Sequence, residues 1–391
     1  MKKMINRRMA VLVGTALVAA ALQAGLRPAI SRSQAGSADI RGRISKNDAP
    51  DAPWKWSKEA YHYRKSADDQ TVCGLCPHTC ILAPGDRSVC RSRVNIDGTL
   101  YSLVYGNPCA VHVDPIEKKP LYHFLPGSRS FSIATTGCNL RCLNCQNWEI
   151  SQSKPHEVRH AELFPDDVAA AAVKADCLSV AYTYSEPLTY YEYTLDSARA
   201  VKAIGAKNVL VSAGYINQGP LEELCRVIDG ANVNLKSFSD AMYRRLNGAR
   251  LEPVLNTFKT LHARGVHFEM TNLVVPGYVD DADMVKRMCA WILDNLGPDH
   301  PLHFSRFFPR YKLDRLAPTP VATLEALREI ALAAGIHYVY LGNVPGHASN
   351  DTRCHQCEKT LIRRAGYRIA EFHITQGNCR YCGAPIPGVW G

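Results

Sequence analysis

Hydrophobic and polar positions change their period along the chain. From Phe131 to about Gly346, short runs of β-branched and aromatic residues alternate with longer stretches of helical period, a pattern typical of repeated βα units. Pro165, Pro220 and Pro320 mark the first turns of three of the helices. The expected strands, in chain order, are Phe131–Thr135, Leu178–Tyr184, Asn208–Ser212, Asn232–Leu235, His267–Val274, Leu302–Phe307 and His337–Leu341.

Consecutive parallel strands joined by right-handed crossovers form a barrel, complete or partial. We therefore expect an α/β protein with a partial, TIM-like (β/α) barrel over residues 131–346. The chain of 391 residues, 46% of them hydrophobic, is long enough for this core and for small appended modules.

Both flanks of the barrel are short and rich in cysteine. Residues 71–130 form the N-terminal module, whose cysteines predict a zinc site or an auxiliary cluster; Cys109 either supplements this set or is a bystander. Residues 347–391 hold two C-x2-C pairs around short strand-like runs, as in a zinc ribbon. The N-terminal set is Cys73, Cys76, Cys80 and Cys90, and the C-terminal set is Cys354, Cys357, Cys379 and Cys382.

The start of the chain resembles a processing segment rather than part of the fold. Residues 1–35 combine Arg7-Arg8, an apolar run from Met9 to Leu26 and a small-residue cleavage site ending at Ala35. This predicts a twin-arginine-like export signal or an uncleaved membrane anchor, followed by a linker over residues 36–70. A cytoplasmic protein is the alternative.

The formal net charge of +10 is concentrated at this end. Residues 1–46 hold nine Lys or Arg against the single Asp39, which leaves +2 for all that follows. The net charge of the chain beyond residue 46 therefore does not indicate a groove for nucleic acid. We expect contact with a membrane only through the N-terminal segment.

The strongest chemical signal follows the first barrel strand. Cys138, Cys142 and Cys145 stand at C-x3-C-x2-C spacing, which suits three irons of a cubane and leaves the fourth iron open to a substrate. Loops after barrel strands converge at the face where active sites are built. A structural zinc knuckle is the alternative, but a fourth ligand is missing nearby.

The stretch from Thr136 to Trp148 resembles the signature of the radical S-adenosylmethionine (SAM) superfamily. That resemblance implies a radical SAM barrel with a [4Fe-4S] cluster on Cys138, Cys142 and Cys145. It also implies SAM as a cofactor, whose reductive cleavage yields a 5′-deoxyadenosyl radical that removes a hydrogen atom from a substrate. The position before the third cysteine is usually aromatic in this family, whereas here it is Asn144.

The resemblance also implies the residues that bind SAM. Glu186, in the turn Tyr184-Ser185-Glu186-Pro187, corresponds to the partner of the methionine ammonium, unless it only caps the next helix. Two of the other candidates for binding SAM also have an alternative interpretation. Lys236 could be an ordinary lysine at the end of a strand, and His303 could be a core histidine. The expected ribose, carboxylate and adenosine contacts are Ser212, Asn234, Lys236 and His303.

Within the superfamily, the chain after residue 70 is most similar to the radical SAM member of the AmmeMemoRadiSam system, a group related to pyruvate formate-lyase activating enzymes. The similarity includes the stretches Cys73–Cys80, Asp114–Leu121 and Leu341–His347. It implies catalysis on an undefined substrate, a flavodoxin- or ferredoxin-type electron donor, and AMMECR1-like and Memo-like partners. A glycyl-radical-activase-like role follows by analogy only.

Lys118 and Lys119 are interpreted as a solvated turn rather than as catalytic residues. The competing class of function is a non-catalytic iron-sulfur electron carrier or a metal-stapled scaffold, which would have a fully ligated cluster indifferent to SAM.

Overall fold

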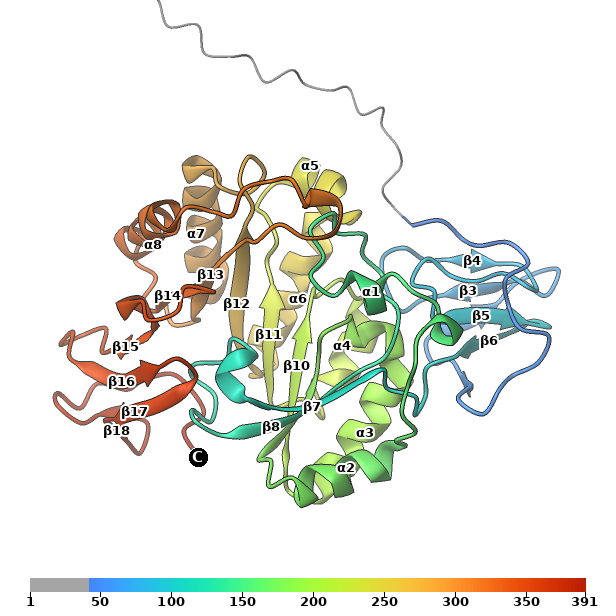
Figure 1. Cartoon of the computed structure of the whole chain (residues 1–391), viewed down its shortest axis with the longest axis horizontal. Coiled ribbons are helices and arrows are strands. Elements are labelled where there is room, and N and C mark those ends of the chain that lie inside the picture. The colour runs from blue at the N-terminus through green and yellow to red at the C-terminus, as the bar shows by residue number, and fades with distance from the viewer. Residues whose placement is uncertain (1–41) are drawn as a thin grey trace, which may run out of the picture. The chain divides into compact units, whose positions relative to one another are not determined.

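An eight-stranded sheet forms the centre of the structure, a computed structural model that describes residues 42–391 (Figure 1). Its strands follow one another in chain order, and β8 to β14 are parallel, whereas β7 pairs with β8 antiparallel. The first and last strands do not pair, so the barrel is partial, as expected. The strands are β7 Ala110–Pro115, β8 Arg129–Ala134, β9 Ser179–Tyr182, β10 Lys207–Ser212, β11 Gly230–Asn234, β12 His267–Val274, β13 Leu302–Arg306 and β14 Val339–Gly342.

All seven expected strands are present, and their bounds shift by a few residues at most. β7 was not expected, because Val111, His112 and Val113 face partly outward and the run ends in Asp114 and Pro115. The main sheet therefore begins inside the stretch assigned to the N-terminal module.

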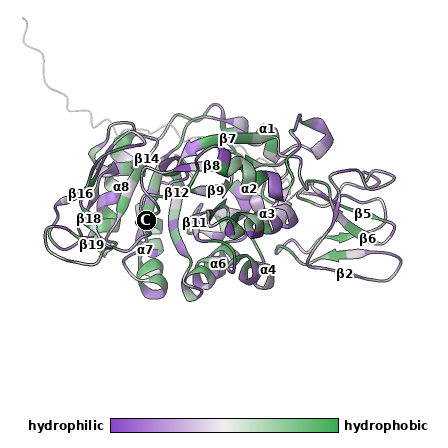
Figure 2. Ribbon diagram, turned by 90° about the horizontal axis from the view of Figure 1, so that it is seen from below, coloured by the Kyte–Doolittle hydropathy of each residue, from purple (hydrophilic) through white to green (hydrophobic). Residues whose placement is uncertain are grey.

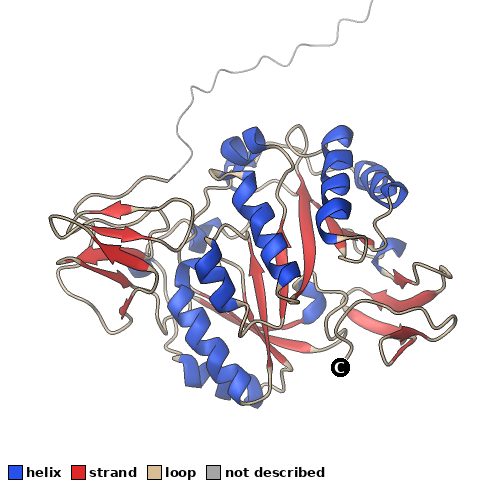
Figure 3. Ribbon diagram, turned by 180° about the vertical axis from the view of Figure 1, so that it is seen from behind, coloured by secondary structure: helices blue, strands red, loops and turns tan. Residues whose placement is uncertain are grey.

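Helices pack against one face of this sheet (Figure 3). Pro165 opens α2, where the backbone N–H of Phe164 donates to the Asp167 carboxylate, and Pro320 is the N-cap of α8. The helix expected at Pro220 begins two residues earlier. The helices are α1 Trp148–Ser151, α2 Pro165–Lys174, α3 Tyr191–Ala203, α4 Gln218–Leu224, α5 Asp240–Met242, α6 Leu251–Ala263, α7 Ala282–Leu296 and α8 Val321–Ala334.

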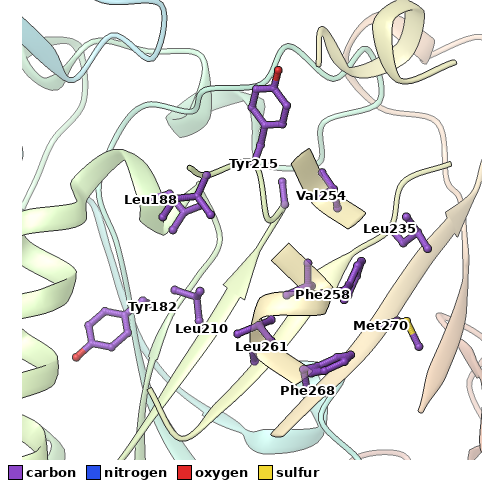
Figure 4. Close-up of a cluster of buried hydrophobic side chains, with 14 of the residues drawn as sticks. Tyr182, Leu188, Leu210, Tyr215, Leu235, Val254, Phe258, Leu261, Phe268 and Met270 are labelled. Atoms are coloured by element: carbon purple, nitrogen blue, oxygen red, sulfur yellow. The ribbon is translucent and has the colours of Figure 1, made fainter. Parts of the chain in front are cut away.

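The hydrophobic core lies between the sheet and these helices. Phe258 of α6 packs on Phe268 of β12, with 5.6 Å between ring centroids, and Leu210 and Met270 are buried around them (Figure 4). Colouring by hydropathy shows apolar positions gathered along the strands and on helical stripes (Figure 2). Burial of this apolar surface is the main force that holds the parallel sheet together.

The other face of the sheet is filled by residues 116–125. Asn232 donates to the carbonyl of Pro120 at 2.8 Å, and the Glu269 carboxylate accepts from the backbone N–H of His123 at 2.7 Å. Within this segment Lys119 is only 1% exposed, and its ammonium lies 2.5 Å from the Asp114 carboxylate. The expectation of a solvated turn is thus wrong for Lys119, because its ammonium also lies 4.5 Å from the centre of the Tyr184 ring, whereas Lys118 is exposed as expected.

Two modules flank the sheet. The N-terminal one contains two three-stranded sheets, β1-β6-β5 and β2-β3-β4. Residues 58–65 belong to it rather than to a linker, because they pair with β6 and β3. The strands are β1 Lys58–Glu59, β2 Tyr63–Lys65, β3 Thr71–Cys73, β4 Ile81–Leu82, β5 Arg93–Ile96 and β6 Thr99–Ser102; the C-terminal module has β15 Thr352–Arg353, β16 Thr360–Ala365, β17 Arg368–Phe372, β18 Ile374–Thr375 and β19 Asn378–Cys379.

The predicted export signal or anchor, residues 1–35, lies outside the described residues. Among residues 42–391, no helix has the length and apolar character needed to cross a bilayer.

We expect the buried His123 to make the stability of the fold depend on pH. Its buried ring bonds to the Pro387 carbonyl at 2.7 Å and to the Tyr340 hydroxyl at 2.6 Å, and burial lowers its pKa to about 4. Between pH 6.5 and 4, His123 binds a proton in the unfolded chain but stays neutral in the folded chain. The free energy of unfolding should therefore fall by up to ~3 kcal/mol as pH drops through this window, and be fully retained above it.

Urea unfolding of the full chain between pH 7 and pH 4 measures this loss. The His123→Asn variant should show a shallower dependence on pH, whereas His156→Asn, at an exposed histidine, should match the parent. Equal slopes for the parent and His123→Asn would contradict the assignment.

Candidate active site

The three cysteines of the C-x3-C-x2-C motif lie in the loop between β8 and α1. Gly137, which precedes the first of them, has φ +98°, and a Cβ there would stand 2.6 Å from the carbonyl oxygen of Cys90. Asn147 ties the far end of the loop to the end of β9 by donating to the Tyr184 carbonyl at 2.7 Å. The loop is thus anchored at both ends over the carboxyl ends of the strands.

Hydrogen-bond donors surround the three sulfurs. The backbone N–H of Leu140 lies 3.3 Å from Cys138 Sγ, the side-chain amide of Asn247 donates to Cys142 Sγ at 3.2 Å, and the Ser151 hydroxyl lies 3.2 Å from Cys145 Sγ. Such donors stabilise thiolates that ligate iron. The residues present therefore fit a cluster held by three thiolates.

Without a metal, the thiols of Cys138 and Cys145 would stay protonated. Burial, together with the nearby Glu186 carboxylate and the neighbouring thiols, raises the pKa of Cys138 well above its usual value. Burial and the charge of Cys142 also raise the pKa of Cys145. A bound cation is what such a pocket needs to hold thiolates.

Glu186 and Ser212 meet beside the cysteine loop. The Glu186 carboxylate accepts from the Ser212 hydroxyl at 2.7 Å, from the backbone N–H of Ala213 at 2.8 Å and from that of Leu188 at 3.3 Å. The last bond caps the 3-10 helix Pro187–Tyr190, so the capping role is real. Burial raises the pKa of Glu186, although these bonds partly offset it.

Asn234 and Lys236 follow at the end of β11. The Asn234 amide donates to the Ser212 carbonyl at 3.1 Å, and the half-buried Lys236 lies within electrostatic range of Glu186 and Cys145. Four of the five residues expected to contact SAM therefore gather around the cysteine loop; their contacts with SAM stay predictions.

His303 stands apart from this group. It is the second residue of β13 and lies opposite Thr271, away from the carboxyl end of the strand. Its Nε2 is 2.6 Å from the Glu269 carboxylate, and Tyr122 packs edge-on against its ring. The structure places His303 in a buried hydrogen bond with Glu269, and its adenosine contact stays a prediction.

Sequence reasoning missed Asn247. It ends the π-helix Tyr243–Asn247, whose backbone also accepts from Arg141 and Leu143 at 2.8 and 2.9 Å. Single π-turns occur often at functional sites, because they turn a side chain out of the helical register. No motif surrounds Asn247 in the sequence, so only the fold brings it to Cys142.

The C-terminal cysteines form a compact group of their own. The sulfurs of Cys354 and Cys382 are 3.6 Å apart, those of Cys357 and Cys379 are 3.7 Å apart, and all four lie within 4.8 Å of one another. A tetrahedral site with metal–sulfur bonds of about 2.3 Å needs sulfurs about 3.8 Å apart. This set can therefore hold one metal ion.

Comparison with known proteins supports the family that the cysteine motif predicts. The family model described as "Radical SAM superfamily" matches residues 132–289, which include the three cysteines and Glu186. An uncharacterized protein of Methanocaldococcus jannaschii is 42% identical over 331 residues, covering 84% of this chain and 98% of the relative. This chain belongs to the radical SAM superfamily.

Two further proteins to which this radical SAM protein is similar carry names that state an activity. The pyruvate formate-lyase 1-activating enzyme of Escherichia coli is 28% identical over 221 residues, covering 52% of this chain and 89% of the relative. A crystal structure of a radical SAM methyltransferase from Sphaerobacter thermophilus is 14% identical, with a TM-score of 0.45, and covers 56% of this chain and 68% of that one.

The superfamily and the activating-enzyme relatives support an enzyme with SAM-dependent radical chemistry. They favour it over the non-catalytic carrier or scaffold.

Proposed function

We propose that this protein cleaves SAM reductively at a [4Fe-4S] cluster held by Cys138, Cys142 and Cys145, and uses the resulting radical to remove a hydrogen atom from a substrate. One observation carries the proposal. Three thiols, each with a hydrogen-bond donor near its sulfur, lie close to Glu186 and Ser212 at the carboxyl ends of β8 to β10. When bound, the cluster supplies the electron and the open iron site for SAM.

The chain's own residues would orient SAM. Ser212 and Ala213 hold the Glu186 carboxylate in place, so that its negative charge is available for an ammonium group. Lys236, within electrostatic range of both Cys145 and Glu186, offers a positive charge for a carboxylate. The two charges are of the signs that the zwitterionic methionine end of SAM requires.

The decisive experiment is anaerobic reconstitution of the full chain with iron and sulfide, followed by SAM and dithionite. We expect 5′-deoxyadenosine and methionine as products, and an EPR signal of the reduced cluster that changes when SAM is added. A fully loaded cluster that forms no 5′-deoxyadenosine would overturn the proposal.

We extend the proposal to the class of substrate. The 28% identity to an activating enzyme over 221 residues supports hydrogen abstraction from a glycine of a partner protein, as a glycyl-radical activase performs. AMMECR1-like and Memo-like proteins, and a flavodoxin- or ferredoxin-type electron donor, are the proposed partners. Incubation of the reduced enzyme and SAM with each candidate should produce a carbon-centred EPR doublet in the true substrate only.

Glu186→Gln should weaken SAM binding. A glutamine keeps the shape but loses the charge, and its amide nitrogen cannot accept from Ser212 or Ala213. Because a charged hydrogen bond contributes ~1.5–3 kcal/mol, we expect the Kd for SAM to rise at least ~10-fold by calorimetry. Ser212→Ala, which keeps the charge, should cost less; an unchanged Kd with a lowered melting temperature would reduce Glu186 to its capping role.

We propose zinc as the metal of the C-terminal group, because four thiols at 3.6–3.7 Å suit its tetrahedral preference. Metal analysis should find one zinc per chain, and Cys357→Ser should lose it and destabilise residues 347–391 against proteolysis. The matched Cys177→Ser variant, outside the cysteine groups, should keep the zinc. Iron at this site in aerobic protein would contradict the assignment.

We also propose that the twin-arginine-like segment exports or anchors the enzyme. Fractionation of tagged full-length protein, with and without Arg7-Arg8→Lys-Lys, would place it; a cytoplasmic protein unaffected by the change would refute export.

A further inference from the structure

The cysteines of the N-terminal module gather around one cavity. Cys73 ends β3, Cys80 precedes β4, and the backbone N–H of Cys73 donates to the Cys80 carbonyl at 2.9 Å. The cavity between these thiols is small, with a volume of about 20 Å³. Its wall includes Cys73, Cys76, Cys80, Cys90, Arg93, Asn139, Leu188 and Thr189.

The spacing of these thiols differs from that of a one-metal site. The C-terminal set shows what one metal requires, with all four sulfurs within 4.8 Å of one another. Elsewhere in residues 42–391, no three Cys, His, Asp or Glu ligand atoms lie that close together. The N-terminal thiols are therefore set wider around their cavity, which suits a cubane because each thiolate binds a different iron.

The cavity wall also carries donors for sulfur. The hydroxyls of Ser88 and Ser92 lie 3.0 and 3.3 Å from Cys90 Sγ. Arg93, 1% exposed, bonds to Glu192 through one terminal nitrogen, but its buried Nε–H has no hydrogen-bond partner among the described residues. An unpaired buried donor beside a cavity lined by thiols indicates that an acceptor belongs there, and the sulfides of a cluster are acceptors.

The cavity shares a wall with the candidate active site. Asn139, between Cys138 and Cys142, lines it and accepts through its carbonyl from His78, with 2.7 Å between the atoms. Cys90 contacts Gly137 so closely that a Cβ on the glycine would lie 2.6 Å from the Cys90 carbonyl oxygen. The two cysteine sets are thus separated by one layer of backbone.

Two cations stand between the sets. The guanidinium groups of Arg91 and Arg141 each lie within electrostatic range of both Cys90 and Cys138. Arg141 also donates to the Cys138 carbonyl at 2.9 Å and to the Val89 carbonyl. Positive charge near two anionic groups offsets the repulsion between them, so that both groups can carry negative charge at close range.

We propose that Cys73, Cys76, Cys80 and Cys90 hold a second iron-sulfur cluster that passes electrons to the cluster on Cys138, Cys142 and Cys145. A low-potential one-electron donor of the flavodoxin or ferredoxin class would reduce the second cluster. That cluster is oxidised again when it gives the same electron to the first, where the proposed SAM cleavage consumes it. The relay step rests on the proposed function, whereas the second cluster does not.

Metal and spectroscopic analysis of the anaerobically reconstituted full chain tests the cluster. We expect about eight irons and eight sulfides per chain, and two EPR signals after reduction, only one of which changes on addition of SAM. About four irons with a second zinc, or a single EPR signal, would overturn the proposal. If both signals appear but no 5′-deoxyadenosine forms, the proposed function fails and the second cluster stands.

The Cys76→Ala variant tests the relay. Iron should fall to about four per chain, and the ratio of flavodoxin-driven to dithionite-driven SAM cleavage should fall at least tenfold, because dithionite reduces exposed clusters directly. Cys225→Ala, a half-buried cysteine outside both sets, should leave the iron content and the ratio as in the parent. If a Cys76→Ala protein has lost four irons but its ratio of flavodoxin-driven to dithionite-driven cleavage is unchanged, the relay is overturned. If the variant does not fold, the EPR spectra of the parent still test the second cluster.

Discussion

The Cys142→Ala variant of the full chain is expected to form 5′-deoxyadenosine at least ~100-fold more slowly than the parent. Cys142 is one of three thiols that the fold offers to the cluster, and its sulfur alone accepts from Asn247. Two remaining thiolates do not retain a cubane in place, because each iron that lacks its protein ligand becomes exposed to solvent and oxygen. Product quantification under dithionite, together with iron and sulfide counts, measures the loss.

Cys225→Ala is the matched control for this variant. Cys225 caps α4 at its C-terminal end and belongs to none of the cysteine groups, so its loss should change neither iron content nor rate. A Cys142→Ala protein that keeps its full iron content and its rate would refute the assignment of this thiol. Circular dichroism of both variants shows whether the barrel is still folded.

Arg93→Met should lower the free energy of unfolding by ~3–5 kcal/mol, the largest stability effect we expect. One terminal nitrogen of Arg93 lies 2.7 and 2.8 Å from the two carboxylate oxygens of Glu192, and both side chains are at most 1% exposed. Removal of the guanidinium leaves a buried carboxylate whose main remaining donor is the backbone N–H of Tyr61, 2.7 Å away. Urea denaturation of the anaerobic protein measures the change.

A double substitution separates the lost pair from lost packing. If an unpaired charge causes the effect, Arg93→Met with Glu192→Met should recover most of the stability, because two apolar side chains can replace a buried ion pair at little cost. A double variant as unstable as Arg93→Met would instead assign the effect to the packing of N-terminal module residues on α3. Together with the Glu192→Met single variant, these proteins form a double-mutant cycle that yields the coupling energy between Arg93 and Glu192.

The agreement between expected and observed strands follows from the fold class. In a parallel sheet covered by helices, both faces of each strand are buried, so strands appear as apolar runs that stand out from the helical stretches. β12, whose expected and observed bounds coincide at His267–Val274, is the clearest case. β7 does not appear as such an apolar run, because it is an edge strand and exposes part of its surface.

The local order of residues thus decided the partial barrel, the cysteine loop after its first parallel strand and the two cysteine-rich flanks, because period and short-range spacing are properties of neighbouring residues. Only the tertiary structure decided that Lys119 is buried against Tyr184, that Asn247 faces Cys142, and that Cys90 touches the loop of Cys138. Each of these contacts joins segments whose approach depends on how the whole sheet is packed. Burial, charge pairing and the distance between the two cysteine sets are set by that packing, and no local pattern records them.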